Sequence, residues 1–203
     1  MKLYYSPGAC SLSPHIALRE SGLDFELVRV DLKTKKTADG QDYMAINPAG
    51  YVPCLQLDDG RTLGEGPAIL QYVADQAPDK HLAPANGSFE RYRLQQWLNF
   101  IGTELHKNFS PLFMPTTSDD AKQAALQMIT TRFAVPARQL EQTIYLLGQQ
   151  FGLADIYLFV VLSWSGYVGV DLSPWPSLQQ FMGRVGSREA TQAALRAEGL
   201  VTE

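Results

Sequence analysis

The sequence is poor in cysteine, with only Cys10 and Cys54 in 203 residues. Two cysteines are too few for a disulfide framework, so we expect reduced thiols in a reducing compartment. No apolar run approaches the ~20 residues that a membrane helix needs. The first residues also lack the apolar core of a secretory signal. We therefore predict a soluble, cytoplasmic protein without a membrane partner.

Basic residues and histidines are also scarce. The chain has 17 Lys and Arg against 21 Asp and Glu, a formal net charge of −4, which argues against a nucleic-acid partner. The three histidines, His15, His81 and His106, are scattered and are not spaced as metal ligands with the cysteines. We therefore predict no metal site.

Strand and helix signals alternate over residues 1–80. A predicted strand at residues 2–5 leads to a helix that Gly22 ends, and a second strand follows at 26–32. A short helix, a hairpin at Asp58-Asp59-Gly60 and a last helix from Pro67 complete the order. Strand, helix, strand, helix, strand, strand, helix is the thioredoxin-like arrangement, and its first unit implies a parallel strand pair.

Residues 77–88 turn to Pro, Asp, Asn and Gly, which is typical of a linker between domains. Nothing beyond this linker resembles a strand. We therefore predict an α/β thioredoxin-like N-terminal domain over residues 1–80 and an all-α C-terminal domain over residues 87–203.

Helical periodicity organises the second domain. Leucines and an isoleucine recur at helical spacing up to about Lys107, and Pro111 and Pro115 are expected to break that helix. A second long helix is predicted from Ser118, kinked or split at Pro136. The apolar segment 154–168 is the expected buried central helix, and two shorter helices should follow Pro176 and Ser187.

Cys10 lies where the first strand ends and the first helix begins. A helix N-terminus favours a thiolate, either that of the cysteine or that of a ligand. Ser13 stands where a Cys-x-x-Cys motif would have its second cysteine, so an internal disulfide is excluded. Monothiol chemistry, a mixed disulfide or hydrogen bonding to a bound thiolate remain, beside the plainer interpretation of a small buried residue.

Two further segments suit a peptide ligand. A cis bond at Val52-Pro53 would turn the Val52 backbone towards an extended ligand, although an ordinary turn proline fits as well. At Glu65-Gly66 a helix N-terminus can hold a carboxylate and Glu65 an ammonium group, unless Glu65 only caps the helix. Together with Cys10, these segments describe a pocket for an extended thiol peptide, and glutathione is the common cellular molecule of that kind.

Several runs of residues resemble bacterial beta-class glutathione transferases. They are the opening Met1 to Ile16, Asn47-Pro48-x-Gly50-x-Val52-Pro53, Glu65-Gly66-x-Ala68-Ile69, Trp97 to Lys107, Ala154-Asp155-x-Tyr157-Leu158-Phe159 and the closing Ala197-Glu198-Gly199-Leu200. These runs extend over essentially the whole chain. The resemblance implies a homodimeric glutathione S-transferase of the glutathione transferase architecture, with reduced glutathione as co-substrate.

The resemblance also implies roles for individual residues. Cys10 would lie at the glutathione sulfur, and Cys10, Ser11 and His106 are the catalytic candidates. The expected glutathione-binding residues are Cys10, Lys35, Val52, Pro53, Glu65, Gly66, Asn99, Thr103, Glu104, Leu105 and His106. For Asn99, Thr103 and Glu104 a polar helix face is the plainer interpretation. His106 and Lys107 would border the pocket for the electrophile.

The expected activity is detoxifying conjugation of glutathione to hydrophobic electrophiles by stabilising its thiolate. A glutathione-dependent thiol–disulfide reductase that uses Cys10, or a non-catalytic ligand binder, are the alternatives. Ala49, Tyr51, Cys54 and Gly152 depart from the family pattern. Cys54 is interpreted as a buried core residue, with a second redox-active thiol as the alternative.

Overall fold

The computed structural model describes residues 1–202, which form two compact units. Unit 1 comprises Met1–Ala83 together with the chain from Arg188 onward, and unit 2 comprises Pro84–Ser187. The sequence predicts one helical domain over residues 87–203. In the structure, the last helix, α10 (Glu189–Ala197), packs instead on α1 (Leu12–Ser21) of unit 1. The C-terminal segment is therefore part of the unit that carries Cys10.

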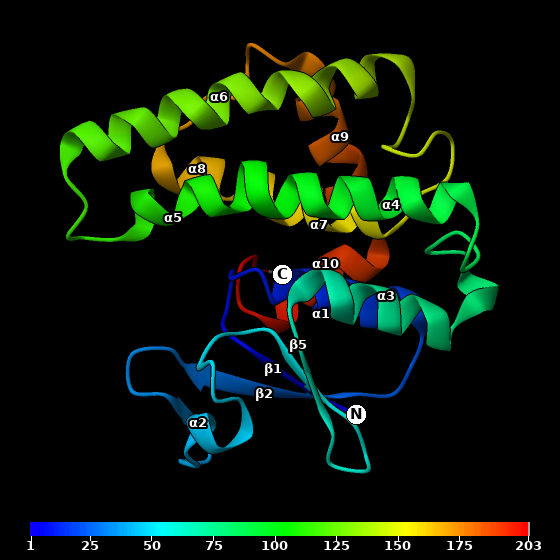
Figure 1. The fold of residues 1–203 in the computed structure, drawn as a ribbon, viewed down its shortest axis with the longest axis vertical. Coiled ribbons are helices and arrows are strands. Elements are labelled where there is room, and N and C mark those ends of the chain that lie inside the picture. Colours follow the sequence, from blue (N-terminus) through cyan, green and yellow to red (C-terminus); the bar gives the residue numbers. More distant parts are fainter. Residues whose placement is uncertain (203) are drawn as a thin grey trace. The chain divides into compact units, whose positions relative to one another are not determined.

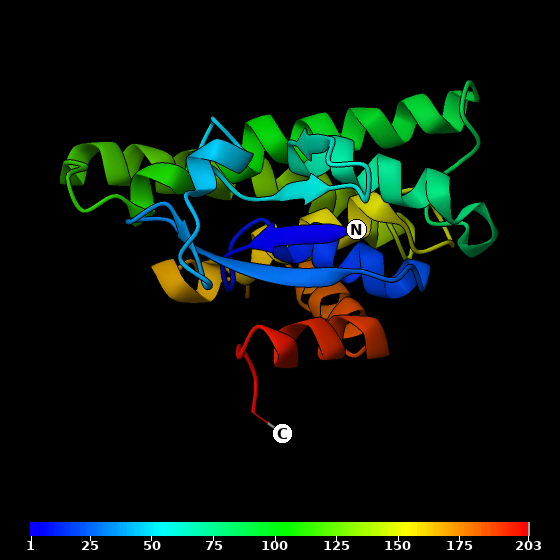
Figure 2. The same cartoon turned by 90° about the horizontal axis from the view of Figure 1, so that it is seen from below.

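Unit 1 is built on a five-stranded sheet with the order β3-β2-β1-β4-β5. Its strands are β1 (Lys2–Tyr5), β2 (Glu26–Asp31), β3 (Lys36–Thr37), β4 (Cys54–Gln56) and β5 (Thr62–Gly64). β1 runs parallel to β2, with Leu3 opposite Leu27, and antiparallel to β4, with Leu3 opposite Leu55. Figure 2 shows β1 between β2 and the β4–β5 hairpin. The predicted parallel pair and hairpin are both confirmed.

The helices of unit 1 lie on both faces of this sheet. They are α1, α2 (Tyr43–Ile46), α3 (Gly66–Gln76), the 3-10 turn η1 (Pro78–Lys80) and α10. α1 contacts both α3 and α10, and Figure 1 shows these three helices on one face and α2 on the other. α1 ends at Gly22, which has a left-handed φ of 70°, as its sequence predicts. Its first residue is Leu12, and Ser11 is its N-cap residue.

A small core supports the segment before β4. It consists of the buried side chains of Tyr4, Val30, Tyr43, Val52 and Cys54. The Tyr43 hydroxyl donates to the carbonyl of Tyr51 at 2.7 Å, and its ring lies 5.5 Å from that of Tyr4. Since Tyr43 belongs to α2, this helix fixes the backbone that leads to Val52.

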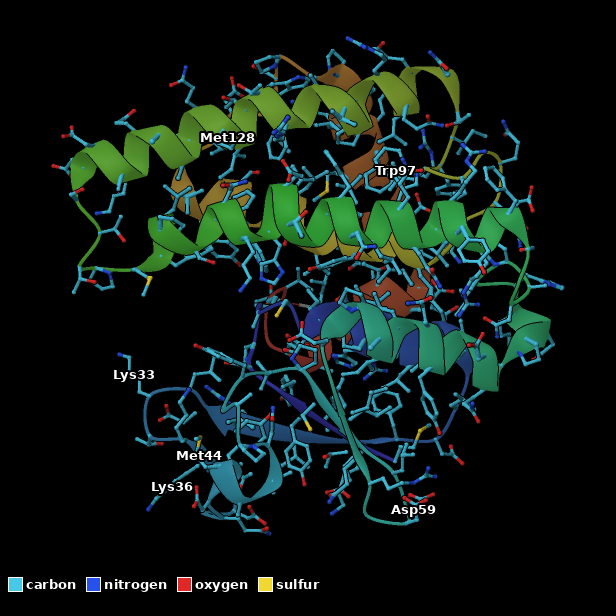
Figure 3. All side chains as sticks on the ribbon, viewed as in Figure 1. Lys33, Lys36, Met44, Asp59, Trp97 and Met128 are labelled. Atoms are coloured by element: carbon cyan, nitrogen blue, oxygen red, sulfur yellow. The ribbon has the colours of Figure 1, made fainter. Side chains whose placement is uncertain are left out.

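Unit 2 is entirely helical. Its elements are α4 (Phe89–Phe100), the π-helical segment η2 (Ile101–His106), α5 (Lys107–Phe113), α6 (Asp119–Gln142), α7 (Leu153–Ser163), α8 (Ser165–Val168) and α9 (Pro176–Gly186). Each residue of α7 from Leu153 to Leu162 is buried, and this helix contacts both α4 and α9. The buried central helix is therefore confirmed, but it ends at Ser163 and the rest of the predicted segment 154–168 forms the separate helix α8. Figure 3 labels Trp97 on α4 and Met128 on α6.

The helix break predicted at Pro111 is wrong, because Pro111 lies inside α5, which continues to Phe113. Pro136 does not split α6, which remains one helix of 24 residues. A proline removes one hydrogen bond, and packing around it can hold the helix together. Phe133 and Ala137, on either side of Pro136, are both buried. No helix within residues 1–202 is long and apolar enough to cross a membrane.

Candidate functional site

Cys10 lies on the turn that joins β1 to α1, and two serines brace this turn. The Ser11 Oγ accepts the N–H of Ser6 and donates to the Ser6 carbonyl, at 3.2 Å in each case. The Ser13 Oγ donates to the Cys10 carbonyl at 2.7 Å. Both serines are fully buried. Ser11 therefore holds the turn in shape.

The Cys10 thiol faces the segment before β4. It is half-buried, and its Sγ–H donates to the carbonyl of Val52 at 3.3 Å. The Val52–Pro53 peptide bond is cis. Cys54 differs sharply from Cys10, because it is 1% exposed and burial raises the pKa of its thiol. The structure thus supports the core interpretation of Cys54 and leaves Cys10 as the accessible thiol.

Lys35 lies beside the loop that precedes Val52. It has a left-handed φ of 55°, and its Nζ donates to the Gly50 carbonyl at 2.8 Å. The same ammonium lies 5.4 Å from the ring centroid of Tyr51, an exposed residue that departs from the family pattern. The φ of Gly50 is 66°, which strains any other residue, and an added Cβ would lie 2.6 Å from the Met44 Sδ, so the Met44 side chain would have to move. Figure 3 labels Met44 and Lys36 at this end of unit 1.

Glu65 has an unusual backbone at the start of α3. Its φ of 63° and ψ of 115° are uncommon for a residue other than glycine, and such outliers occur often at binding sites. Its carbonyl accepts the N–H groups of Ala68 and Ile69, whereas its exposed side chain makes no capping bond. Simple helix capping therefore does not explain Glu65. A Cβ on Gly66 would lie 3.9 Å from the Pro53 Cγ, so this segment adjoins the cis proline.

The predicted residues of unit 2 gather on η2 and the turn before it. Asn99 and Thr103 are exposed, and the Thr103 Oγ1 donates to the Asn99 carbonyl at 3.0 Å. The Glu104 Oε2 lies 2.8 Å from the Nε of Arg132. Leu105 is fully buried, so only its backbone is accessible to a ligand. π-helical segments are frequent at functional sites, and this one spans four of the predicted residues.

His106 closes the π-helical segment and belongs to an aromatic cluster. Its Nδ1 lies 2.7 Å from the Tyr157 hydroxyl, and its ring centroid lies 4.8 Å from that of Trp164. Burial lowers the pKa of His106 to about 4, and the positive charge of Lys107 adds to this effect. The imidazole is therefore uncharged at neutral pH, and it can donate one hydrogen bond and accept another.

Within each unit the structure brings most of the predicted residues together. In unit 1, contacts join Cys10 to Val52 and Gly66 to Pro53, while Lys35 bonds the loop just before them. In unit 2, the predicted residues follow one another along η2. Within residues 1–202 no group of three or more His, Cys, Asp or Glu side chains is placed to hold a metal ion.

Sequence reasoning missed two residues with clear roles. Tyr157 is the hydrogen-bonding partner of His106, and Gly50 makes room for Met44 and accepts from Lys35. Both residues lie inside the sequence runs that resemble the family, and this position is the one feature of the sequence that could have pointed to them. Nothing in the local sequence indicates these contacts: His106 and Tyr157 are 51 positions apart, and Lys35 and Gly50 are 15 apart.

The fold and the arrangement around Cys10 together define a class of protein. A thioredoxin-like unit presents an accessible thiol at a helix start, opposite a cis proline, and an all-helical unit accompanies it. This is the glutathione transferase architecture that the sequence predicts for this chain. Models of the glutathione S-transferase N-terminal and C-terminal domains match residues 8–76 and 100–189.

Individual relatives agree with these matches. Glutathione S-transferase GstA of Escherichia coli O157:H7 is 48% identical over 98% of this chain and 100% of its own. The bacterial glutathione S-transferase BphK, solved as a ternary complex, is 75% identical with a TM-score of 0.97, over 98% of this chain and 100% of its own. A beta-class enzyme of Sphingomonas chungbukensis is 52% identical with a TM-score of 0.96, over 99% and 100%.

The chain belongs to the glutathione S-transferase family, and its resemblance to the bacterial beta class is confirmed. The predicted fold class and the prediction of a transferase enzyme are confirmed with it.

Proposed function

We propose that this glutathione S-transferase conjugates reduced glutathione to hydrophobic electrophiles, with Cys10 beside the glutathione sulfur. The contact between the Cys10 thiol and the Val52 carbonyl carries the proposal. It sets an accessible thiol at a helix start, next to backbone that can pair with an extended peptide. Glutathione is such a peptide, and its own thiol would lie at the same place.

The charges of unit 1 complement those of glutathione, which has two carboxylates and one ammonium group. The free N–H groups at the N-terminus of α3, at Gly66, can donate to the γ-glutamyl carboxylate. The exposed Glu65 can pair with the neighbouring ammonium group of glutathione. Lys35 would leave the Gly50 carbonyl and bind the glycyl carboxylate. Val52 would pair with the cysteinyl backbone, and Pro53 would set its direction.

The resemblance to the beta class implies further contacts to glutathione from Asn99, Thr103, Glu104 and the Leu105 backbone. Of these, Asn99 and Thr103 have exposed side chains. His106 is a neutral hydrogen-bonding group in an aromatic cluster, which suits an apolar electrophile with a polar substituent.

The proposed mechanism stabilises a thiolate and positions it. The start of α1 favours negative charge on sulfur, and the Cys10 S–H can donate to that sulfur instead of to Val52. Each unit by which the pKa of the glutathione thiol falls corresponds to about 1.4 kcal/mol. The site then holds the electrophile beside the thiolate, so the reaction avoids the entropy cost of bringing two free molecules together.

A thiol–disulfide reductase is the second candidate, and the accessibility of Cys10 favours it. The Cys10 thiolate would attack a glutathionylated substrate, forming a mixed disulfide with glutathione and releasing the substrate thiolate. A second glutathione thiolate would then attack this mixed disulfide, releasing oxidised glutathione and the Cys10 thiolate. Ser13 cannot act as a resolving thiol, so the second glutathione is required.

The variants Cys10→Ser and Cys54→Ala separate these activities. For conjugation, assayed with a chlorinated nitroaromatic, Cys10→Ser should retain part of the wild-type rate, because a hydroxyl can still donate to the glutathione sulfur. For reduction, assayed with a mixed disulfide of glutathione, it should retain none. Cys54→Ala, the buried control, should leave both activities near wild type. Tight ligand binding without turnover in either assay would instead indicate a non-catalytic binder.

We further propose a cytoplasmic homodimer that acts in detoxification. The resemblance to the beta class implies the dimer, and exposed apolar side chains such as Tyr51 in unit 1 and Phe89 in unit 2 are consistent with burial against a second copy. Light scattering after gel filtration should give twice the chain mass of 22.5 kDa. A mass of one chain at micromolar concentration would refute the dimer.

A further inference from the structure

A cavity of about 730 Å³ opens at the end of α1, and none of its lining residues is proposed to bind glutathione. Its lining comes from the last turn of α1, the segment before β2 and the first turns of α10, all within unit 1. Figure 1 shows α1 and α10 side by side, and the two helices are in contact. Arg19, which lines the cavity, lies about 10 Å along the axis of α1 from Leu12, where the helix begins. The volume is that of a small-molecule site.

Apolar side chains line much of this cavity. Leu18 is fully buried, whereas Leu23 and Phe25 are half-buried. From α10 the cavity receives Ala190 and Ala193, which are also half-buried and are small enough to leave the space open. The ring of Phe25 offers an aromatic ligand a partner for stacking or for an edge contact. The lining therefore suits a compact apolar group.

Arg19 adds a positive charge to this lining. Its Nε donates to the His15 Nε2 at 2.8 Å, and its Cζ lies 5.9 Å from the ring centroid of Phe25. Both contacts fix the plane of the guanidinium. Within residues 1–202 no acceptor pairs with its two Nη groups. Two parallel N–H donors on a fixed plane match the two oxygens of a carboxylate.

The other charged residues of the lining leave this cation available to an anion. Both oxygens of Glu20 accept from Arg188, from its Nε at 2.6 Å and from its Nη2 at 2.9 Å. The charge of Glu20 is therefore largely neutralised by a bidentate partner. Glu189 is exposed, so water and salt screen its charge. These two carboxylates nevertheless disfavour a ligand with two negative charges, such as a phosphate monoester, and favour one with a single charge.

We propose that this cavity binds a small aromatic carboxylate, at a site separate from the one for glutathione. The carboxylate would accept from both Nη groups of Arg19, and the aromatic ring would lie between Phe25 and the two alanines of α10. The inference goes beyond the reaction proposed for Cys10 and does not depend on it. It gives the chain a second ligand site with its own chemistry.

Isothermal titration with biphenyl-4-carboxylate tests this site, and uncharged biphenyl-4-carboxamide is the matched comparison. The carboxylate should bind once per chain with a Kd below about 1 mM, and saturating glutathione should change that Kd by less than about twofold. The carboxamide should bind about 10- to 100-fold more weakly, because it cannot form a charge-assisted pair with Arg19.

Two variants assign the binding to the cavity. Arg19→Gln should weaken binding of the carboxylate about 10- to 100-fold, because it removes the paired charge. Ala193→Leu keeps Arg19 and fills the space of the aromatic ring, so it should weaken binding by about tenfold or more. Arg196→Gln and Ala197→Leu make the same two changes at exposed positions of α10 outside the lining, and both should bind like the wild type.

Four outcomes would overturn the proposal. They are no binding of the carboxylate at ~1 mM, equal binding of the carboxamide, displacement by glutathione, and an Ala193→Leu protein that binds like Ala197→Leu. If Arg19→Gln does not fold because His15 loses its donor, Ala193→Leu and the carboxamide decide by the same criteria. If glutathione does not bind the wild type, the proposed function fails, and the carboxamide and the variants still test the cavity.

Discussion

Replacing Asp155 by alanine should destabilise the protein, because this carboxylate accepts two buried backbone N–H groups. Asp155 is the third residue of α7 and is 1% exposed. Its Oδ1 accepts from Leu146 and its Oδ2 from Gly152, at 2.9 Å in each case. Gly152, the N-cap residue, has no side chain that could replace these contacts. Asp155→Ala therefore leaves two buried donors without an acceptor.

The size of the effect follows from these two bonds. An orphaned buried N–H costs about 1–3 kcal/mol, so two cost roughly 2–6 kcal/mol. For a chain of this length, 1 kcal/mol corresponds to about 2–4 °C in Tm, and we expect Asp155→Ala to lower Tm by roughly 5–20 °C. Asp155→Asn keeps one acceptor and should show about half the loss. Asp120→Ala, at an exposed position in the first turn of α6, should change stability by less than about 0.5 kcal/mol.

Asp155 also predicts a pH dependence. Burial raises the pKa of this carboxyl from 3.8 to about 7, although the two N–H donors oppose the shift. Between these values the unfolded chain has lost the proton and the folded chain retains it. The protonated Asp155 carboxyl therefore makes its full contribution to the free energy of unfolding below pH 4. This contribution is lost as pH rises through 7, and the free energy of unfolding falls by at most about 1.4 kcal/mol per pH unit. Calorimetry at several pH values should show this slope in the wild type and its absence in Asp155→Asn. A Tm drop below about 2 °C for Asp155→Ala would refute the reasoning.

Two further predictions concern Gly50, whose carbonyl accepts from Lys35, and His106. Gly50→Ala should cost about 1–2 kcal/mol in chemical denaturation, because its φ of 66° strains alanine and the Met44 side chain must also move, and it should weaken glutathione binding. Gly60→Ala, with a positive φ but no atom within 4 Å of its Cβ, should cost less, and equal losses would contradict the steric argument. In an NMR titration, His106 should change protonation near pH 4, and Lys107→Gln should raise its pKa by removing the opposing charge. A His106 midpoint near 6.5 would show that burial does not control it.

Much of the fold was predictable because its signals are local. The strand–helix–strand order, the hairpin at Asp58-Asp59-Gly60 and the end of α1 at Gly22 depend on turn residues and on short apolar runs. The break expected at Pro111 was wrong and Pro136 does not split α6, because packing within unit 2 outweighs the loss of one hydrogen bond.

The site was predictable in its residue types but not in its hydrogen bonds. Cys10, Val52 and Glu65 were found from helix starts and a strand entrance, which are features of local sequence. The bracing role of Ser11 was missed, because it depends on how the turn folds back on the Ser6 backbone. The hydrogen bond from the Gly8 N–H to the Glu198 carboxylate spans nearly the whole chain, and no spacing indicates it.

The most direct test of the central claim is isothermal titration of the wild type and of Cys10→Ser with reduced glutathione, with mass spectrometry of the same samples. We predict micromolar to low-millimolar binding by both proteins, because most of the proposed contacts to glutathione come from groups other than the Cys10 thiol. Any covalent glutathione adduct should reside on Cys10 and be absent from Cys10→Ser. No detectable binding to the wild type, or an adduct on the buried Cys54, would contradict the account.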